Sequence, residues 1–188
     1  MLLKKICLSI LPFLLLFACQ DNQPSGESKS DSSQPFFDLK GYFNQEVQRL
    51  ANIRSIKKTA VVDGQKEEKM LDTLNFEQEL KIFSDNDINR PAWSGKYQMD
   101  SIFNENKELV KLNYTASDES LKTQKMEIDF KQGVVAKIFI ENSTANAISD
   151  TKQFLTYQPQ LGYSIESHQK VAMSGEKKFL VEVQFLGK

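Results

Sequence analysis

Cysteine is scarce in this chain of 188 residues, and both cysteines, Cys7 and Cys19, lie near its N-terminus. No residue after Cys19 can therefore form a disulfide, bind zinc through sulfur or act as a thiol nucleophile. The rest of the chain must be held together by an apolar core instead. The 13 phenylalanines and a hydrophobic fraction of 40% are enough to build one.

Histidine is limited to His168, and the chain has no G-x-S-x-G, H-E-x-x-H, P-loop or G-x-G-x-x-G pattern. A catalytic histidine also needs a nucleophile and an orienting acid beside it. The alternation of residues 161–172 places His168 on the polar face of a strand, where we expect it to be solvated. We therefore predict that the protein is not an enzyme and assign no catalytic residue. A hydrolytic pair of carboxylates stays open, because a sequence does not give their separation in space.

An excess of either charge is absent too, since 24 Lys and Arg residues face 25 Asp and Glu residues. Nucleic-acid binding usually needs a clustered basic excess, so we expect no nucleic-acid partner. Asp85, Asp87 and Asn89 alternate like calcium ligands, but Arg90 and Lys96 stand where a calcium loop needs its glycine and its bidentate glutamate. We expect an Asx-rich loop that ends a helix, with no metal and no cofactor.

A long apolar run is also missing. The run from Ile6 to Phe17 follows two lysines and has about twelve residues, whereas a membrane-spanning helix needs roughly 20. It fits the apolar region of a secretory signal. Leu16-Phe17-Ala18-Cys19 then precedes a stretch rich in Ser, Asp, Gln, Gly and Pro, which ends at Pro35 and has no apolar residue to bury. Such a composition is typical of a flexible tether.

This N-terminus resembles a bacterial lipoprotein signal peptide, although small residues are commoner than Phe17 at its position. The resemblance implies cleavage before Cys19 and lipid attachment to its sulfur. We expect residues 1–18 to be the signal peptide, residues 19–35 the lipidated cysteine and tether, and residues 36–188 one domain. The alternative is a structural cysteine, whose sole possible disulfide partner would be Cys7. Gln20 directly after the cysteine implies, by analogy with enterobacterial lipoproteins, the outer membrane.

The domain itself has the pattern of an α+β fold. Asp38 can cap a helix whose apolar stripe is Leu39, Phe43, Leu50 and either Val47 or Glu46, and Asn75 can cap a second helix. Asp63-Gly64 indicates a hairpin. The expected strands cover residues 55–62, 66–74, 95–103, 107–116, 121–130, 134–142, 150–157, 161–172 and 178–186. Their short connections favour a meander. We predict one curved antiparallel sheet of seven to nine strands, with two helices on its apolar face.

The segment Asn89-Arg90-Pro91-Ala92-Trp93 holds the single tryptophan. Trp93 could be an exposed aromatic that binds a partner together with Arg90, as at many interface hot spots. It could instead fill the gap between a helix end and the sheet. Both interpretations stay open, and Arg90 and Trp93 are our candidate partner-binding residues.

Three segments are similar to a family of Bacteroidota lipoproteins: YFNQEVQRL (42–50), DINRPAWSGKY (87–97) and TYQPQLGYSIESHQKV (156–171). This resemblance implies a location in the cell envelope and a single domain, and it implies no activity.

Two functions follow as expectations. The first is a non-enzymatic binding or assembly module, tied to the membrane by its lipid, that holds an outer-membrane protein partner. The second is a carrier of lipid or lipoprotein. Its apolar cavity would lie under the curved sheet and be lined by phenylalanines: Phe130, Phe139, Phe154, Phe179 and Phe185. The same side chains could instead fill a solid core.

Overall fold

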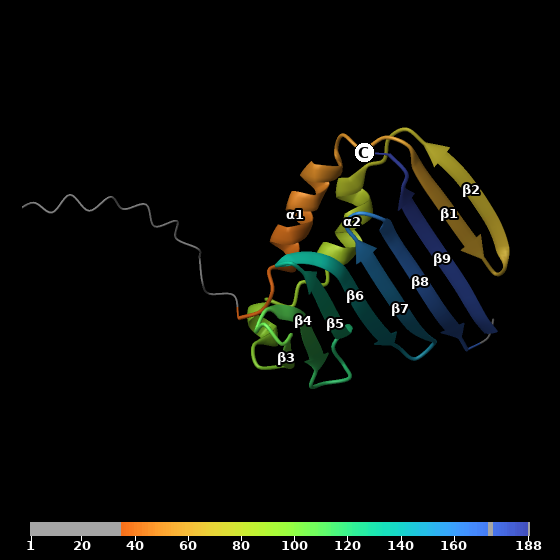
Figure 1. Cartoon of the computed structure of the whole chain (residues 1–188). Helices are drawn as coiled ribbons and strands as arrows, with labels where there is room; N and C mark the ends of the chain where they lie inside the picture. The colour runs from red at the N-terminus through yellow and green to blue at the C-terminus, as the bar shows by residue number, and fades with distance from the viewer. Residues whose placement is uncertain (1–34, 173–174, 188) are drawn as a thin grey trace, which may run out of the picture. The chain divides into compact units, whose positions relative to one another are not determined.

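The computed structural model of the chain describes residues 35–172 and 175–187 (Figure 1). Cys19, the expected signal peptide and residues 20–34 of the expected tether lie outside the described residues. The helices are α1 (Leu39–Leu50), α2 (Phe76–Ser84) and the short 3-10 helix η1 (Pro91–Trp93). The strands are β1 (Ile56–Val62), β2 (Gln65–Leu71), β3 (Tyr97–Phe103), β4 (Leu109–Ala116), β5 (Thr123–Lys131), β6 (Val134–Ala145), β7 (Ser149–Gln158), β8 (Gly162–Val171) and β9 (Gly175–Phe185).

The nine strands found among the described residues belong to one antiparallel sheet, with the order β2-β1-β9-β8-β7-β6-β5-β4-β3. Strands β3 to β9 pair consecutively, which confirms the predicted α+β fold with a curved meander. The hairpin β1–β2 does not stand beside β3, its nearest later neighbour in sequence. It pairs instead with β9, where Ile56 lies opposite Phe185. The sheet is therefore open, with β2 and β3 as its two edges.

Helices α1 and α2 pack against one face of the sheet, which we call the helix face (Figure 1). The side chains buried between them include Phe43, Phe83, Ile138 and Tyr157. The ring of Phe83 lies 5.8 Å, between centroids, from each of the rings of Tyr157 and Tyr163. Within residues 35–172 and 175–187, no helix has the length and the apolar character needed to cross a bilayer.

The start of α1 follows the predicted cap. Asp38 Oδ1 accepts a hydrogen bond from the backbone N–H of Gly41 at 2.8 Å. Glycine in the first turn normally weakens a helix. At this position, however, a Cβ atom would lie 2.1 Å from Asp38 Oδ2. The absence of a side chain at Gly41 therefore leaves room for the cap.

Of the two candidates for the stripe of α1, Glu46 is the buried one and Val47 is half-buried. The carboxylate of Glu46 accepts hydrogen bonds from Arg49 Nε at 2.8 Å and from the hydroxyl of Tyr157. A buried carboxylate is tolerated when it is paired and hydrogen-bonded in this way. Helix α2 has the matching arrangement, in which Glu79 accepts from the hydroxyl of Tyr163 and pairs with Lys58 at 2.6 Å.

The other face of the sheet, which we call the open face, is mostly polar. A row of cross-strand partners on it runs from Glu127 through Phe139, Thr156 and Ser164 to Glu182. The prediction that these phenylalanines line one cavity is wrong, because they do not all lie on the same face of the sheet. Phe139 and Phe154 stack on the open face with ring centroids 6.4 Å apart, whereas Phe130 and Phe185 pack against the core on the helix face. The strand alternation separates these side chains, so they do not surround one cavity.

Candidate binding surface beside the N-terminal segment

The described chain begins with two aromatic side chains that are fixed to the sheet. The ring of Phe36 lies edge-on to the ring of Tyr114, with centroids 5.6 Å apart. The ring of Phe37 lies 6.4 Å from the ring of Phe130. Edge-to-face contacts of this kind add to the free energy gained from burial. Residues 35–38, which we call the N-terminal segment, are therefore fixed to the sheet at Phe36 before α1 begins.

Asn89 holds the backbone of this segment. Its side-chain Oδ1 accepts from the N–H of Phe36 at 3.1 Å, and its Nδ2 donates to the carbonyl of Phe37 at 3.0 Å. The hydroxyl of Tyr114 accepts from the N–H of Phe37 at 3.1 Å, and burial raises the pKa of that hydroxyl. The backbone groups ahead of α1 thus find partners on the loop after α2 and on β4.

The carboxylates of the same loop also have partners in the protein. Asp87 accepts from the N–H groups of Lys40 at 3.0 Å and Asn89 at 2.8 Å, and Asp85 forms an ion pair with Lys81 at 2.7 Å. Among the residues that the structure describes, no group of three His, Cys, Asp or Glu side chains could hold a metal ion. The loop ends α2 and ties it to α1, as expected of an Asx-rich turn.

Arg90 and Trp93 are brought together directly after this loop. The guanidinium carbon of Arg90 lies 4.5 Å from the centroid of the Trp93 ring, and its Nη2 donates to the carbonyl of Asp85 at 2.8 Å. Trp93 is half-buried and packs against Tyr97, at 6.2 Å between ring centroids. The ring contacts the core, as the second interpretation expected, and it also supports an exposed cation. Binding of a partner at this pair stays a prediction.

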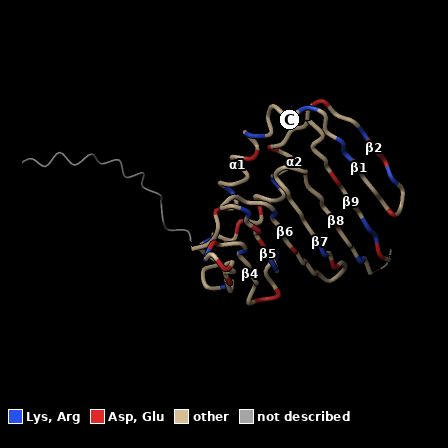
Figure 2. Tube along the Cα trace, in the orientation of Figure 1, with Lys and Arg blue, Asp and Glu red and all other residues tan. Residues whose placement is uncertain are grey.

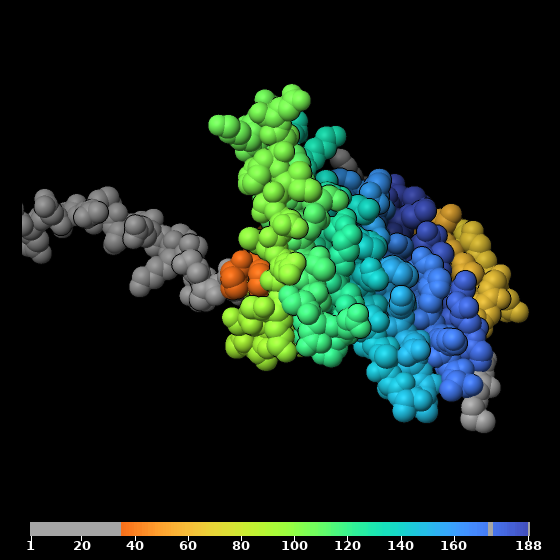
Figure 3. Space-filling view, turned by 90° about the horizontal axis from the view of Figure 1, so that it is seen from below, coloured from red at the N-terminus to blue at the C-terminus, as the bar shows by residue number. Residues whose placement is uncertain are grey.

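A hollow of about 550 Å³ lies between the N-terminal segment and this loop, with Pro35 and Phe36 on one side and Ile88, Arg90 and Pro91 on the other. In Figure 3 the first described residues (orange) lie against the segment that leads into β3 (lime). Arg90 is exposed at this hollow. An apolar hollow with one exposed cation is suited to bind an apolar group that carries an acceptor.

His168 lies on the open face, as the alternation of its strand predicted, and its side chain is 31% exposed. Its Nε2 is 2.6 Å from Glu166 Oε1, and its Nδ1 is 3.8 Å from Glu176 Oε1. The ring stands edge-on to Phe154 with centroids 6.0 Å apart. The imidazole is thus half-buried and paired with carboxylates, which is more structured than the solvated side chain we expected.

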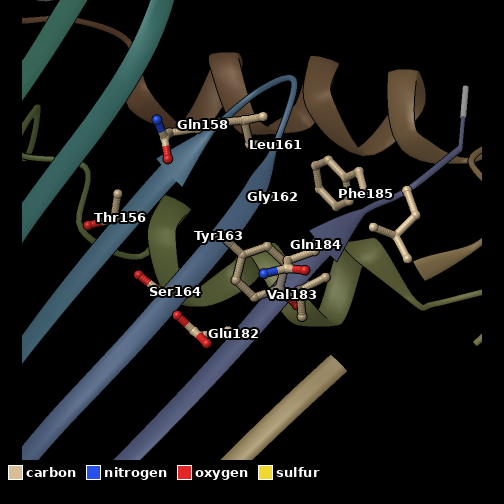
Figure 4. A pocket seen from close by; sticks show the side chains of 11 residues that line it. Thr156, Gln158, Leu161, Gly162, Tyr163, Ser164, Glu182, Val183, Gln184 and Phe185 are labelled. Carbon is tan, nitrogen blue, oxygen red and sulfur yellow. The ribbon is translucent and has the colours of Figure 1, made fainter. Parts of the chain in front are cut away.

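A second hollow, of about 390 Å³, lies on the open face at the β7–β8 turn (Figure 4). Thr156, Ser164 and Glu182 line it from three neighbouring strands, together with Gly162 near the turn. Gly162 has φ of +134°, and a Cβ atom there would lie 1.8 Å from the carbonyl oxygen of Val183. The close approach of β8 to β9 at this position is therefore a backbone contact that only glycine allows.

The sequence pointed to Arg90 and Trp93, but it did not reveal the role of Asn89, which we had considered as a calcium ligand. Its three backbone contacts lie 52 or 53 residues away along the chain. The signal that could have found them is Phe36-Phe37, an aromatic pair that directly follows a polar tether and needs a binding site on the domain. Comparisons of the chain with family models, curated proteins and solved structures found no match.

Proposed function

We propose that this chain is a lipid-anchored, non-enzymatic binding or assembly module of the cell envelope, placed at the outer membrane by a lipid on Cys19. Its partner is an outer-membrane protein that contacts the surface around Arg90 and Trp93. The observation that carries the proposal is the Arg90–Trp93 pair, an exposed cation held 4.5 Å from a half-buried ring beside an apolar hollow. Arginine and tryptophan are the side chains most enriched at interface hot spots.

The position of the pair supports the same proposal. Pro35, the first described residue, lines the same hollow as Arg90. A tether of sixteen residues has a root-mean-square reach of roughly 20–24 Å. An anchor at Cys19 would therefore hold the Arg90–Trp93 side of the domain at about that distance from the membrane on average. A partner embedded in the membrane would meet this surface first.

Site-specific photo-cross-linking in the cell envelope tests the proposal. We would place a benzophenone amino acid at Ala92, which is exposed between Arg90 and Trp93, and at Lys66 on the far edge strand β2 as the control. The expected result is one dominant outer-membrane adduct from position 92 that is absent from position 66. Arg90→Glu should remove it, because the cation becomes an anion. Equal and diffuse adducts from both positions would refute the proposal.

A further inference from the structure

The two edges of the sheet differ in how their side chains protect them. Strand β2 has four consecutive charged residues from Lys66 to Lys69 (Figure 2). Their side chains form ion pairs with one another and with Lys57. Strand β3 has one charged residue, Asp100. Its large apolar side chains are exposed instead, by 48% at Met99, 45% at Ile102 and 57% at Phe103.

An edge strand presents unpaired backbone N–H and C=O groups to any extended chain that approaches it. Proteins usually protect such edges with charged residues, as β2 does. In the described part of the chain, residues 97–103 make no backbone hydrogen bond to any element except β4. The hairpin of β3 and β4 also projects from the side of the domain (Figure 3, lime and green). The β3 edge is thus long, apolar and accessible.

The side chains on β3 define what could lie beside it. On the helix face Met99 lies next to Tyr114, so a neighbouring strand would find an apolar surface there. On the open face Asp100 lies opposite Asn113 and has no ion-pair partner among the described residues. The buried Oδ1 of Asn113 has no hydrogen-bond partner in the same part of the chain. That atom is buried, so the acceptor that the open face offers to a neighbouring strand is the exposed carboxylate of Asp100.

We infer that the β3 edge binds an extended segment of a partner protein as a tenth strand. The segment places an apolar residue beside Met99 on the helix face and a lysine or arginine beside Asp100 on the open face. Main-chain hydrogen bonds supply affinity in this mode of recognition, and the side-chain sites supply specificity. The inference rests on the proposed function and deepens it, because β3 starts a few residues after Trp93 and extends the same surface.

A second copy of this chain fits the edge less well. Strand β3 has the sequence YQMDSIF, which contains no lysine or arginine. Pairing of β3 with β3 would therefore leave Asp100 without a cation in every register. Charge complementarity favours a partner strand of different sequence.

Selection from a library of short random peptides tests the inference, with the full chain in detergent micelles as bait. The selected peptides should alternate apolar residues and carry a lysine or arginine. Hydrogen-exchange mass spectrometry should show added protection at residues 97–103. Both Met99→Lys and Asp100→Lys should weaken binding by about tenfold or more. Met70→Lys, an exposed methionine on the opposite edge, is the matched control and should leave binding unchanged.

Three outcomes would overturn the inference: no such peptides are enriched, Met99→Lys has no effect, or protection appears elsewhere. Self-association that Met99→Lys abolishes would also overturn it, since the occupant would then be a second copy. If the cross-link at position 92 persists while the β3 variants bind normally, the proposed function survives and only the strand addition fails. Circular dichroism of each variant should match that of the parent protein.

Discussion

Tyr157 and Tyr163 lie opposite each other on β7 and β8, and their hydroxyl groups bind glutamates on two different helices. Tyr157 donates to Glu46 of α1, and Tyr163 donates to Glu79 of α2. Burial raises the pKa of both hydroxyls, so they remain protonated donors at neutral pH. One cross-strand pair therefore fixes both helices to the sheet.

Removal of the tyrosine hydroxyl that binds α1 should lower the free energy of unfolding more than removal of the hydroxyl that binds α2. We expect Tyr157→Phe to lower the free energy of unfolding by about 1.5–3 kcal/mol, as for a hydrogen bond to a charged group. Tyr163→Phe should cost less, because the side chain of Glu79 is 21% exposed while that of Glu46 is 9% exposed. Urea denaturation of the two variants measures the difference. Equal losses would contradict the assignment of Glu46 as the more buried partner.

Alkaline pH should destabilise the fold through its buried tyrosines. Burial raises the pKa of Tyr97 from 10.0 to about 12, against the opposing effects of its hydrogen bond to Thr123 and of Arg90. A tyrosine with a raised folded-state pKa favours the fold fully below its unfolded pKa, and this contribution is lost as the pH rises to the folded value. Stability should therefore fall between pH 10 and about pH 12. Urea midpoints across this range measure it, and Tyr97→Phe should reduce the slope.

Asn89→Ala should release the N-terminal segment. Loss of the Asn89 amide removes the acceptor for the N–H of Phe36 and the donor for the carbonyl of Phe37. We expect a destabilisation of about 2–3 kcal/mol and faster hydrogen exchange at the amides of both phenylalanines. Asn104→Ala is the control, because Asn104 bonds within its own exposed turn. Unchanged exchange at Phe36 would show that the aromatic contacts alone hold the segment.

Gly162→Ala should be strongly destabilising, by about 3 kcal/mol or more. The new Cβ atom would meet the carbonyl of Val183 at 1.8 Å in a backbone with φ of +134°. Gly133→Ala is a matched control, since Gly133 has φ of +76° and no atom within 4 Å of the new Cβ position. It should cost about 1–2 kcal/mol through backbone strain alone. Thermal unfolding of both variants would show whether the contact with Val183 matters.

Cys19→Ala tests the proposed anchor. The variant should leave the membrane fraction and appear in the soluble fraction, because no acyl chains would be attached. Intact mass spectrometry of the parent protein should show the added lipid and the loss of residues 1–18. If the variant stays in the membrane fraction, lipidation at Cys19 does not anchor the chain.

Local patterns predicted most of the fold. The Asp38 cap predicted the start of α1, and alternation in segments such as residues 125–130 predicted the strands and their buried face. The turn signal at Asp63-Gly64 gave the first hairpin, and the structure has φ of +49° and +88° at these two residues. In each case the deciding interactions lie within a few residues of one another.

The remaining features depend on distant residues. Glu46 breaks the apolar pattern of α1, and its burial is explained by the hydrogen bond from Tyr157, which lies 111 residues later in the sequence. The placement of β1 beside β9 could not be read from turns, because the two strands lie at opposite ends of the domain sequence. At the candidate surface, the single tryptophan drew attention to Trp93 and Arg90. The contact between them, and the role of Asn89, depend on how α2 ends against the N-terminal segment.

The position of β9 between β1 and β8 also sets an order of events during synthesis. The hairpin β1–β2 leaves the ribosome early, yet its place in the sheet exists only after β9 has been made. Until then it is an isolated two-stranded ribbon, which is marginal in water. The charged residues Lys66 to Lys69 keep its outer strand soluble during this interval. Because the final strand joins this hairpin to the rest of the open sheet, we expect completion of the fold to be a late, long-range step.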